Sequence, residues 1–154
     1  MRGWFKLDKI DRKIIEFLQI DGRMTVLQLS KELNLSRPAI NERIKKLQES
    51  NVIQGFTTKI SPEAIGKEII VMIEVNNVKV ECHKFEELIQ DEYDIVECHR
   101  ITGQSSYIMK AIVPNMKRVR ELIDRLIPFA QLNTSVVLSS PIQNRLLLPD
   151  ETTN

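Results

Sequence analysis

The segment from Ser36 to Lys46 carries the side chains whose types and spacing could do chemistry. Ile40, Ile44 and Leu47 recur at helical spacing on one side, and the opposite side is polar and mainly basic. That side carries Pro38, Asn41, Glu42, Lys45 and Lys46, with Arg37 and Arg43 on its flanks. Lys and Arg neutralise phosphates, while Arg and Asn hydrogen-bond the edges of bases. The face therefore fits double-stranded DNA, although a merely solvated helix face shows the same pattern.

Two earlier helices are expected to position this face. The first runs from about Asp8 to Gln19, and the second from about Thr25 to Leu33. Thr25 is followed three residues later by Gln28, which is the spacing of a capping box. Ser36 caps the third helix, which ends near Ser50 and carries a proline in its first turn, where a missing N–H costs little. Two short helices joined by a tight turn to a basic helix predict a helix-turn-helix.

In such a motif the last helix enters the major groove and its flanks meet phosphates. We expect base contacts from Arg37, Asn41, Glu42 and Lys45, and phosphate contacts from Ser36, Arg43 and Lys46. Pro38 lies on the same face, and Thr25 and Gln28 are further candidates for phosphate contacts. Two interpretations of Glu42 stay open, because its spacing fits both a base reader and a salt-bridge partner of Lys45 or Lys46.

The charge distribution divides the chain. Residues 1–60 hold twelve Lys and Arg against seven Asp and Glu, a net charge of +5, whereas residues 61–154 hold ten against fourteen, a net charge of −4. A basic third joined to an acidic remainder predicts two domains with different partners. We expect a DNA-binding domain over 1–60, a linker over 61–67 with Pro and Gly, and a second domain over 68–154.

The second domain alternates in its predicted elements. Strands are expected at 68–75, 95–101, 107–113 and 132–138, and helices at 84–90 and 116–127, with a short fifth piece at 145–148. The order βαββαβ is the ferredoxin-like plan. The fold class is therefore α+β, a three-helix winged helix-turn-helix domain followed by a ferredoxin-like domain. Apolar residues at Ile70, Met72, Val96 and Val137 predict an uncovered sheet face that pairs two copies as a homodimer.

Several classes of protein do not fit the sequence. The longest aliphatic run, Ile69 to Ile73, is too short to span a bilayer, and the N-terminus has no apolar region of a secretory signal. Two cysteines form no disulfide framework, so we expect a reduced cytoplasmic protein. Common catalytic and phosphate-binding motifs are missing, so we expect no enzyme and no cofactor.

Two Cys-His doublets raise the question of a metal. Cys82-His83 and Cys98-His99 supply the ligand types of a structural zinc site. Neighbours on a strand point to opposite faces, so Cys98 and His99 do not easily share one ion. We therefore expect no metal, with Cys98 a small buried side chain and His99 facing the sheet interface.

Several motifs resemble the leucine-responsive regulator (Lrp)/AsnC family. They are Leu7-Asp8-Lys9-Ile10-Asp11, Asp21-Gly22-Arg23, Arg43-Ile44-Lys45-Lys46-Leu47 and Val52-Ile53-Gln54-Gly55-Phe56, then Glu97-Cys98-His99, Thr102-Gly103 and Val113-Pro114-Asn115-Met116. The resemblance covers about residues 7–145. It implies a nucleoid-associated transcription regulator that binds promoter DNA, assembles from dimers into octamers or other rings, and responds to an amino acid held near the loop after the second strand.

That loop departs from the family pattern. The family commonly reads Gly-Asp-x-Asp-Tyr, whereas this chain reads Gly103-Gln104-Ser105-Ser106-Tyr107. A buried ammonium group needs a carboxylate or several carbonyl acceptors. Either effector specificity is altered or lost, or backbone groups hold the effector and these side chains matter little.

Two other functions also fit parts of the sequence. Sirohaem decarboxylase subunits resemble the same family in both halves, so architecture alone does not exclude an enzyme. An architectural nucleoid protein with little sequence preference would show a steep salt dependence and a small ratio of specific to nonspecific affinity. The basic third helix favours the regulator over the enzyme.

Overall fold

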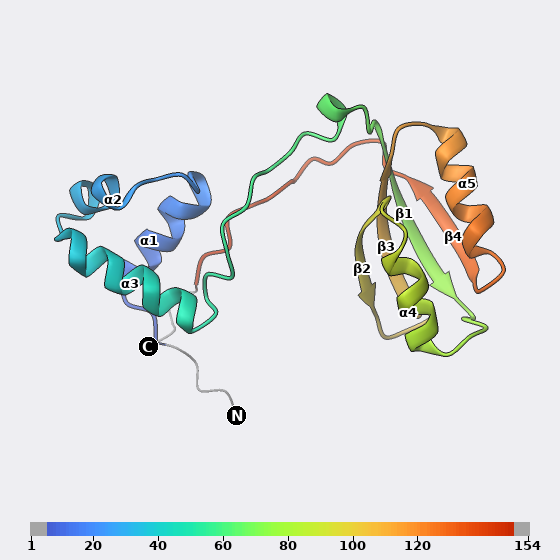
Figure 1. The fold of residues 1–154 in the computed structure, drawn as a ribbon, viewed down its shortest axis with the longest axis horizontal. Helices are drawn as coiled ribbons and strands as arrows, with labels where there is room; N and C mark the ends of the chain where they lie inside the picture. The colour runs from blue at the N-terminus through green and yellow to red at the C-terminus, as the bar shows by residue number, and fades with distance from the viewer. Residues whose placement is uncertain (1–5, 150–154) are drawn as a thin grey trace. The chain divides into compact units, whose positions relative to one another are not determined.

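The computed structural model describes residues 6–149, which form two compact units (Figure 1). The first unit contains the described residues up to Lys59 together with those from Ile142 onward, and the second contains residues 60–141. Each is described separately. No helix among residues 6–149 is long and apolar enough to cross a membrane.

Three helices make up the first unit: α1 (Lys9–Ile20), α2 (Val26–Leu33) and α3 (Arg37–Glu49). Each begins at the residue expected to cap it, because the side chains of Asp8, Thr25 and Ser36 accept hydrogen bonds from the first free backbone N–H groups. The helices pack around a small core of Ile14, Ile15, Leu29, Ile40 and Leu47. The predicted three-helix arrangement is confirmed.

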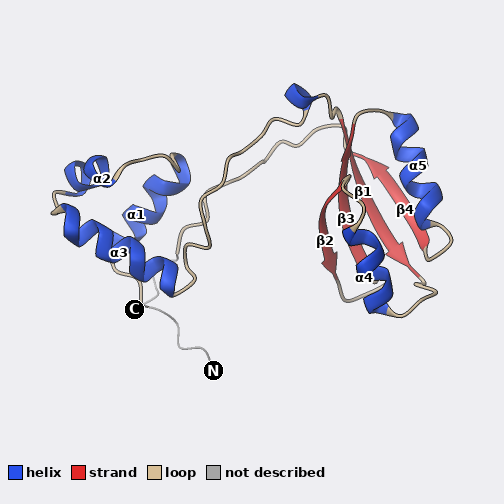
Figure 2. Ribbon diagram, viewed as in Figure 1, coloured by secondary structure: helices blue, strands red, loops and turns tan. Residues whose placement is uncertain are grey.

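A four-stranded antiparallel sheet and two helices make up the second unit. In chain order these are β1 (Ile69–Asn76), α4 (Cys82–Gln90), β2 (Ile95–Arg100), β3 (Tyr107–Val113), α5 (Met116–Leu126) and β4 (Gln131–Val136). The strand order is β2-β3-β1-β4, as the ferredoxin-like plan requires. Figure 2 shows α4 and α5 on one face of the sheet. The predicted βαββαβ order is confirmed.

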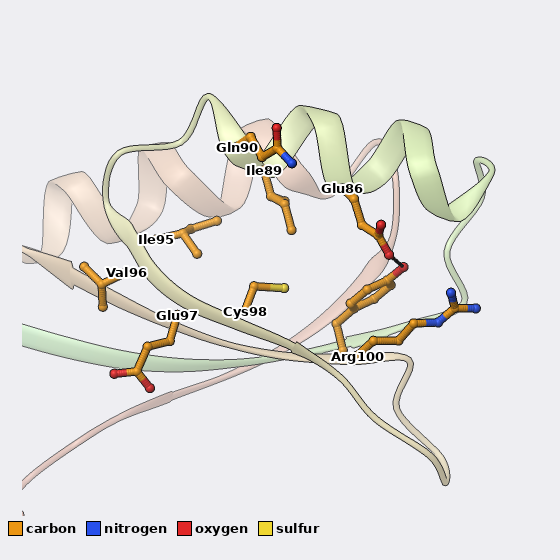
Figure 3. A pocket seen from close by; sticks show the side chains of 9 residues that line it. Glu86, Ile89, Gln90, Ile95, Val96, Glu97, Cys98 and Arg100 are labelled. Carbon is orange, nitrogen blue, oxygen red and sulfur yellow. Dashed lines mark hydrogen bonds between the residues drawn. The ribbon is translucent and has the colours of Figure 1, made fainter. Parts of the chain in front are cut away.

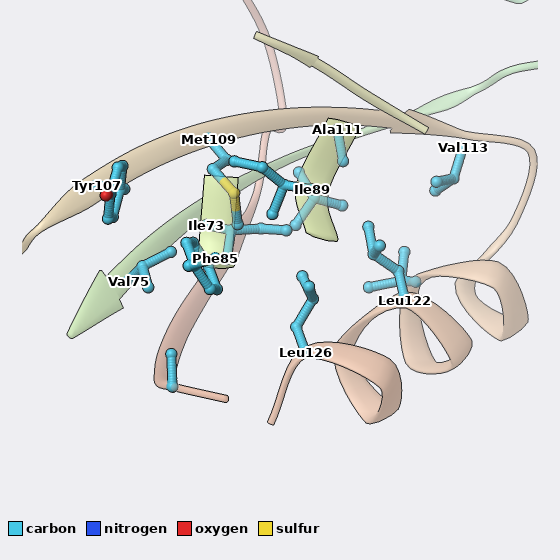
Figure 4. Packing of buried hydrophobic residues seen from close by; sticks show 13 residues of the cluster. Ile73, Val75, Phe85, Ile89, Tyr107, Met109, Ala111, Val113, Leu122 and Leu126 are labelled. Atoms are coloured by element: carbon cyan, nitrogen blue, oxygen red, sulfur yellow. The ribbon is translucent and has the colours of Figure 1, made fainter. Parts of the chain in front are cut away.

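The core of this unit lies between the sheet and its helices (Figure 4). Alternate residues of β1 and β3 point into it, as the period-2 geometry of a strand requires. They meet the apolar stripes of α4 and α5, and the buried set includes Ile73, Met109, Phe85, Leu122 and Leu126. Both helices described in this unit, α4 and α5, lie on that one face, and neither covers the opposite face of the sheet.

Aliphatic side chains gather on that opposite face. Ile70 and Met72 of β1 alternate with the buried residues and are half-buried, and the register places Met72 beside Lys110. The set on this face is Ile70, Met72, Ile108, Ile112 and Val137. Val96 lies instead at a bulge of β2. The structure thus keeps three of the four residues expected on an uncovered face.

The segments flanking the second unit differ from the expectation. Residues 52–60, which follow α3, contain neither helix nor strand, so they form no strand of a wing, and the linker holds one 3-10 turn at Glu63–Ile65. The short strand predicted at 145–148 is wrong, because the chain there pairs with no strand. Residues from Ile142 onward group with the helical unit, so the second unit ends at Pro141. The expected ends at 1 and 154 lie outside the described residues.

Candidate functional site

The outer face of α3 is open to solvent along its length. Ser36, Arg37, Pro38, Asn41, Glu42, Lys45 and Lys46 are all exposed, while Ile40 and Leu47 on the other side are buried. Ser36 caps the helix and Pro38 occupies its second position, where no intrahelical N–H bond is lost. The helix therefore presents the polar set predicted from its spacing as one continuous surface.

Two basic side chains on this face are held by acidic neighbours on the same helix. Lys46 Nζ lies 2.7 Å from a carboxylate oxygen of Glu42, and Lys45 Nζ lies 3.6 Å from Glu49. The hydrogen bond from Lys46 lowers the pKa of Glu42. Of the two interpretations of Glu42, the structure shows the salt bridge with Lys46. Among the described residues, Arg37 takes part in no salt bridge, so its guanidinium is free to meet a ligand.

Arg43 points away from this surface. Its Nη1 lies 2.7 Å from Asp8 and 2.7 Å from Asp11, so the guanidinium ties α3 to the start of α1. Burial alone raises the pKa of Asp8, but the backbone N–H of Asp11 and the Arg43 guanidinium outweigh it and the pKa lies below its ordinary value. Sequence reasoning placed Arg43 near phosphates and missed these partners, which lie more than thirty positions away.

Thr25 and Gln28 are already occupied with each other. The Thr25 backbone N–H donates to Gln28 Oε1 at 2.7 Å, and the Gln28 N–H donates to Thr25 Oγ1 at 3.2 Å. Both residues are exposed at the first turn of α2. This capping box confirms the predicted start of α2, and it leaves the Gln28 side-chain N–H₂ as the group able to reach a phosphate.

The loop between β2 and β3 holds the predicted effector residues. Gly103 has a φ of 115°, which favours glycine, and Gln104 is exposed beside it. The Ser106 N–H donates to the Val75 carbonyl at 2.8 Å, and its own carbonyl accepts from Ile101. Ser105 and Ser106 are half-buried. The loop is thus anchored at its base and offers polar but uncharged side chains at its tip.

Tyr107 differs from the other residues of this group because it is buried. It begins β3, and its hydroxyl donates to Glu86 Oε1 at 2.8 Å. Burial and this hydrogen bond raise the pKa of the phenol. Its hydroxyl is therefore engaged inside the unit and is not presented to the loop.

A cleft of about 340 Å³ lies beside Tyr107, between α4 and the edge strand β2 (Figure 3). Its lining combines an acid, Glu86, and a base, Arg100, with apolar groups that include Ile89 and Ile95. Sequence reasoning missed Glu86, and only its position on the helix face opposite the strand could have indicated it. The cleft provides groups of both charges, which is the chemistry that a zwitterionic small molecule needs.

The two cysteines are both free thiols. No group of three or more potential metal ligands occurs among residues 6–149. Cys82 begins α4, and Cys98 is exposed on β2, so the expectation of a buried Cys98 is wrong. The Cys98 thiol nevertheless faces α4, where desolvation and the Glu86 charge raise its pKa. His99 lies on the opposite face, in register with Ile108, as expected.

Comparisons with known families match both units. The model of the AsnC-type helix-turn-helix domain matches residues 7–48, and the model of the Lrp/AsnC ligand binding domain matches residues 68–147. The first match spans the three helices, and the second spans the sheet with its helices.

Similar proteins match nearly the whole chain. The leucine-responsive regulatory protein of Escherichia coli is 33% identical over 92% of this chain and 92% of its own length. The transcriptional regulator LrpC of Bacillus subtilis is 30% identical over 87% of this chain and 93% of its own, and its structure superposes with a TM-score of 0.86 over 92% of this chain and all of that one. A regulator of Neisseria meningitidis, solved as a complex with L-Met, has a TM-score of 0.83 at 26% identity, over 92% of this chain and 96% of that one.

Proposed function

The chain belongs to the Lrp/AsnC family of transcriptional regulators, and from that premise we propose how it acts on DNA. Two copies read a promoter with paired α3 helices, and a small molecule held by the second unit modulates their binding. The proposal names residues for each of these steps.

The exposed face of α3 carries the proposal. Arg37 and Asn41 are exposed near the start of the helix, where the residues of a recognition helix meet base edges in the major groove. Arg suits guanine and Asn suits adenine, because each forms two hydrogen bonds with that base. We assign base contacts to Arg37, Asn41 and Lys45, with Pro38 beside them on the same face, and we assign Glu42 to the salt bridge with Lys46.

The remaining predicted DNA-binding residues are assigned to affinity for DNA and not to sequence specificity. We assign phosphate contacts to Lys46, Ser36 and the Gln28 amide, which are exposed, with the Thr25 N–H holding Gln28 in place. Arg43 has a different role from the one its type suggests. Because its guanidinium is bonded to Asp8 and Asp11, it positions α3 on α1 and leaves the phosphates to its neighbours.

Pairing of copies is proposed through the uncovered face of the sheet. That face exposes parts of five largely apolar side chains beside the salt bridge between Lys110 and Glu97 and the carboxylate of Glu74. A two-fold axis through such a face makes it self-complementary. A dimer that reads two half-sites holds its recognition helices about 34 Å apart or a multiple of it, because that is one turn of DNA. Sedimentation of the Met72→Asp variant should show monomers; octamers or other rings are expected to build on the dimer.

The effector is proposed to be an amino acid or a related small molecule. A relative carries L-Met in its solved structure, but the loop of this chain has Gln104 and Ser106 where the family pattern has acids. We infer that effector specificity is altered, with the ammonium group of any effector held by backbone carbonyls or by an acid outside the loop, such as Glu86. As a regulator of transcription, the protein is proposed to act in the cytoplasm on the nucleoid, without a catalytic role.

Two variants test the division between specificity and affinity. Asn41→Ala should weaken binding to the gene's own upstream region by about tenfold and leave random DNA unchanged. Lys46→Ala should weaken both and reduce the slope of log affinity against log salt by about 1. Lys117→Ala removes the same charge from α5 and should change neither. Equal losses on both DNAs for Asn41→Ala would contradict the assignment.

A further inference from the structure

The last described residues of the chain return to the helical unit. β4 ends at Val136 in the second unit, and the residues from Ile142 onward belong to the first (Figure 1). We call residues 142–149 the C-terminal strap. The two units are therefore joined by two stretches of chain, one entering the second unit after Lys59 and one leaving it at Pro141.

A single side chain of α1 fastens the strap. Gln19 Nε2 donates to the Leu147 carbonyl at 2.8 Å, and the Leu147 N–H donates to Gln19 Oε1 at 2.9 Å. The amide thus satisfies both polar groups of one backbone residue, as a neighbouring strand would. These partners lie 128 positions apart, so the contact is long-range and not the product of local propensity.

An apolar groove lies beside these two bonds. The side chains of Ile15 and Leu18 on α1, together with residues 52–56 and 147–149, line a groove of about 530 Å³. Leu147 as a residue is 83% exposed, while its backbone N–H and carbonyl are bonded to Gln19. Leu146 and Pro149 are half-buried. The strap is therefore bonded to α1 through its backbone, and residues 147–149 line the groove beside that helix.

The C-terminal strap and α3 contact opposite ends of α1. Gln19 lies in the last turn of α1, whereas Asp8 and Asp11 at its first turn bind Arg43 of α3. We propose that the C-terminal strap is a regulatory contact: fastened to α1 by Gln19, it keeps the three helices in their DNA-binding geometry, and its release weakens DNA binding. Since the strap is covalently continuous with β4, it links the ligand-binding unit to α1 independently of the linker.

Hydrogen exchange in the full-length protein tests the contact. The Leu147 amide should exchange about tenfold more slowly than in an unstructured peptide, which is the effect of about 1.4 kcal/mol. Gln19→Glu keeps the acceptor but loses the donor, and it should speed the exchange of amides 146–148. Leu147→Pro removes the N–H itself, and it should speed the exchange of amides 146 and 148. Gln143→Glu makes the same change on an exposed strap side chain that forms no hydrogen bond among the described residues, and should leave them protected. Unchanged exchange in the α2 and α3 amides shows that each variant folds.

Binding of the gene's own upstream DNA tests the regulatory role. Gln19→Glu should weaken binding severalfold, Gln143→Glu should not, and added DNA should slow exchange at Leu147 by the same factor, because coupling between two sites is reciprocal. An unprotected Leu147 amide in the wild-type protein overturns the contact, and lost protection with unchanged affinity overturns its regulatory role. The DNA-binding measurement rests on the proposed function. A wild-type protein that binds no DNA refutes that function, while the exchange measurement still decides the contact.

Discussion

Arg43 Nη1 lies 2.7 Å from Oδ1 of Asp11, a residue 32 positions earlier in the chain. The same nitrogen reaches Asp8, which caps α1. One guanidinium therefore joins the recognition helix to the first turn of the first helix. This contact separates Arg43 from the other basic residues of α3, which face solvent, and gives it a role in orienting the face that reads DNA.

Arg43→Ala should destabilise the helical unit by about 1–2 kcal/mol, because the mostly buried Asp11 carboxylate keeps the Asp8 N–H but loses its cationic partner. This loss of stability is smaller than a fully buried ion pair would give, because Asp8 is half exposed and solvent screens its charge. Hydrogen exchange of α1 and α3 amides measures the change. Arg37→Ala removes the same charge from the same helix and should leave stability unchanged while weakening DNA binding. If the two variants were equally stable, the positioning role assigned to Arg43 would be wrong.

Glu42→Gln should strengthen binding to promoter and random DNA alike by about threefold. The substitution removes a negative charge from the DNA-facing surface and frees Lys46, now 2.7 Å from that carboxylate, for phosphate. Fluorescence anisotropy on both DNAs measures this change. A loss confined to promoter DNA would instead identify Glu42 as a base reader.

Restoring two acids to the loop tests the inferred change in effector specificity. The double variant Gln104→Asp with Ser106→Asp should bind L-Met or L-Leu about tenfold more tightly than the wild type, since a carboxylate hydrogen-bonds an ammonium group more strongly than a neutral side chain does. Calorimetry measures the affinity. Asn at both positions matches the shape without the charge and should give no gain. Wild-type affinity equal to that of the Asp variant would show that these side chains matter little.

Acid should destabilise the second unit through Asp94. Its carboxylate accepts from Arg118 Nε at 2.6 Å and from Lys67 at 3.3 Å. Burial raises the pKa of Asp94, but these two cations outweigh it and the pKa lies below the ordinary value of 3.8. The unfolded chain therefore binds the proton more readily, so the free energy of unfolding is highest above pH 4 and falls as pH drops through the folded pKa. Urea unfolding between pH 5 and pH 2.5 should show a smaller decrease for Asp94→Asn; equal pH dependence would contradict this role.

The elements of the fold were predictable where the signals are local. Each of the caps at Asp8, Thr25 and Ser36 lies within one helical turn of the N–H groups that it accepts from. The apolar residues that follow each cap recur every three or four positions. Their order along the chain was enough to identify both units, and the exposed face of α3 followed from the phase of Ile40 and Leu47.

Contacts between distant residues were not predictable in the same way. The sequence places Arg43 on the flank of its helix, but nothing local indicates Asp8 and Asp11 as its partners. Leu146 to Leu148 form an apolar run that suggests a strand, whereas the partner of Leu147 is a side chain 128 positions away. Cys98 was expected to be buried as a small apolar side chain. It is exposed because β2 lies at the edge of the sheet, and the order of the strands cannot be read from the sequence.

The central claim is that this protein reads the sequence of DNA, and the most direct test is its affinity for two DNAs at two salt concentrations. Fluorescence anisotropy would compare the gene's own upstream region with random DNA of equal length. The account predicts at least about a hundredfold preference for the upstream region, retained at the higher salt. Equal affinities that both collapse with salt would indicate an architectural DNA-binding protein, and no binding to either DNA would contradict the account altogether.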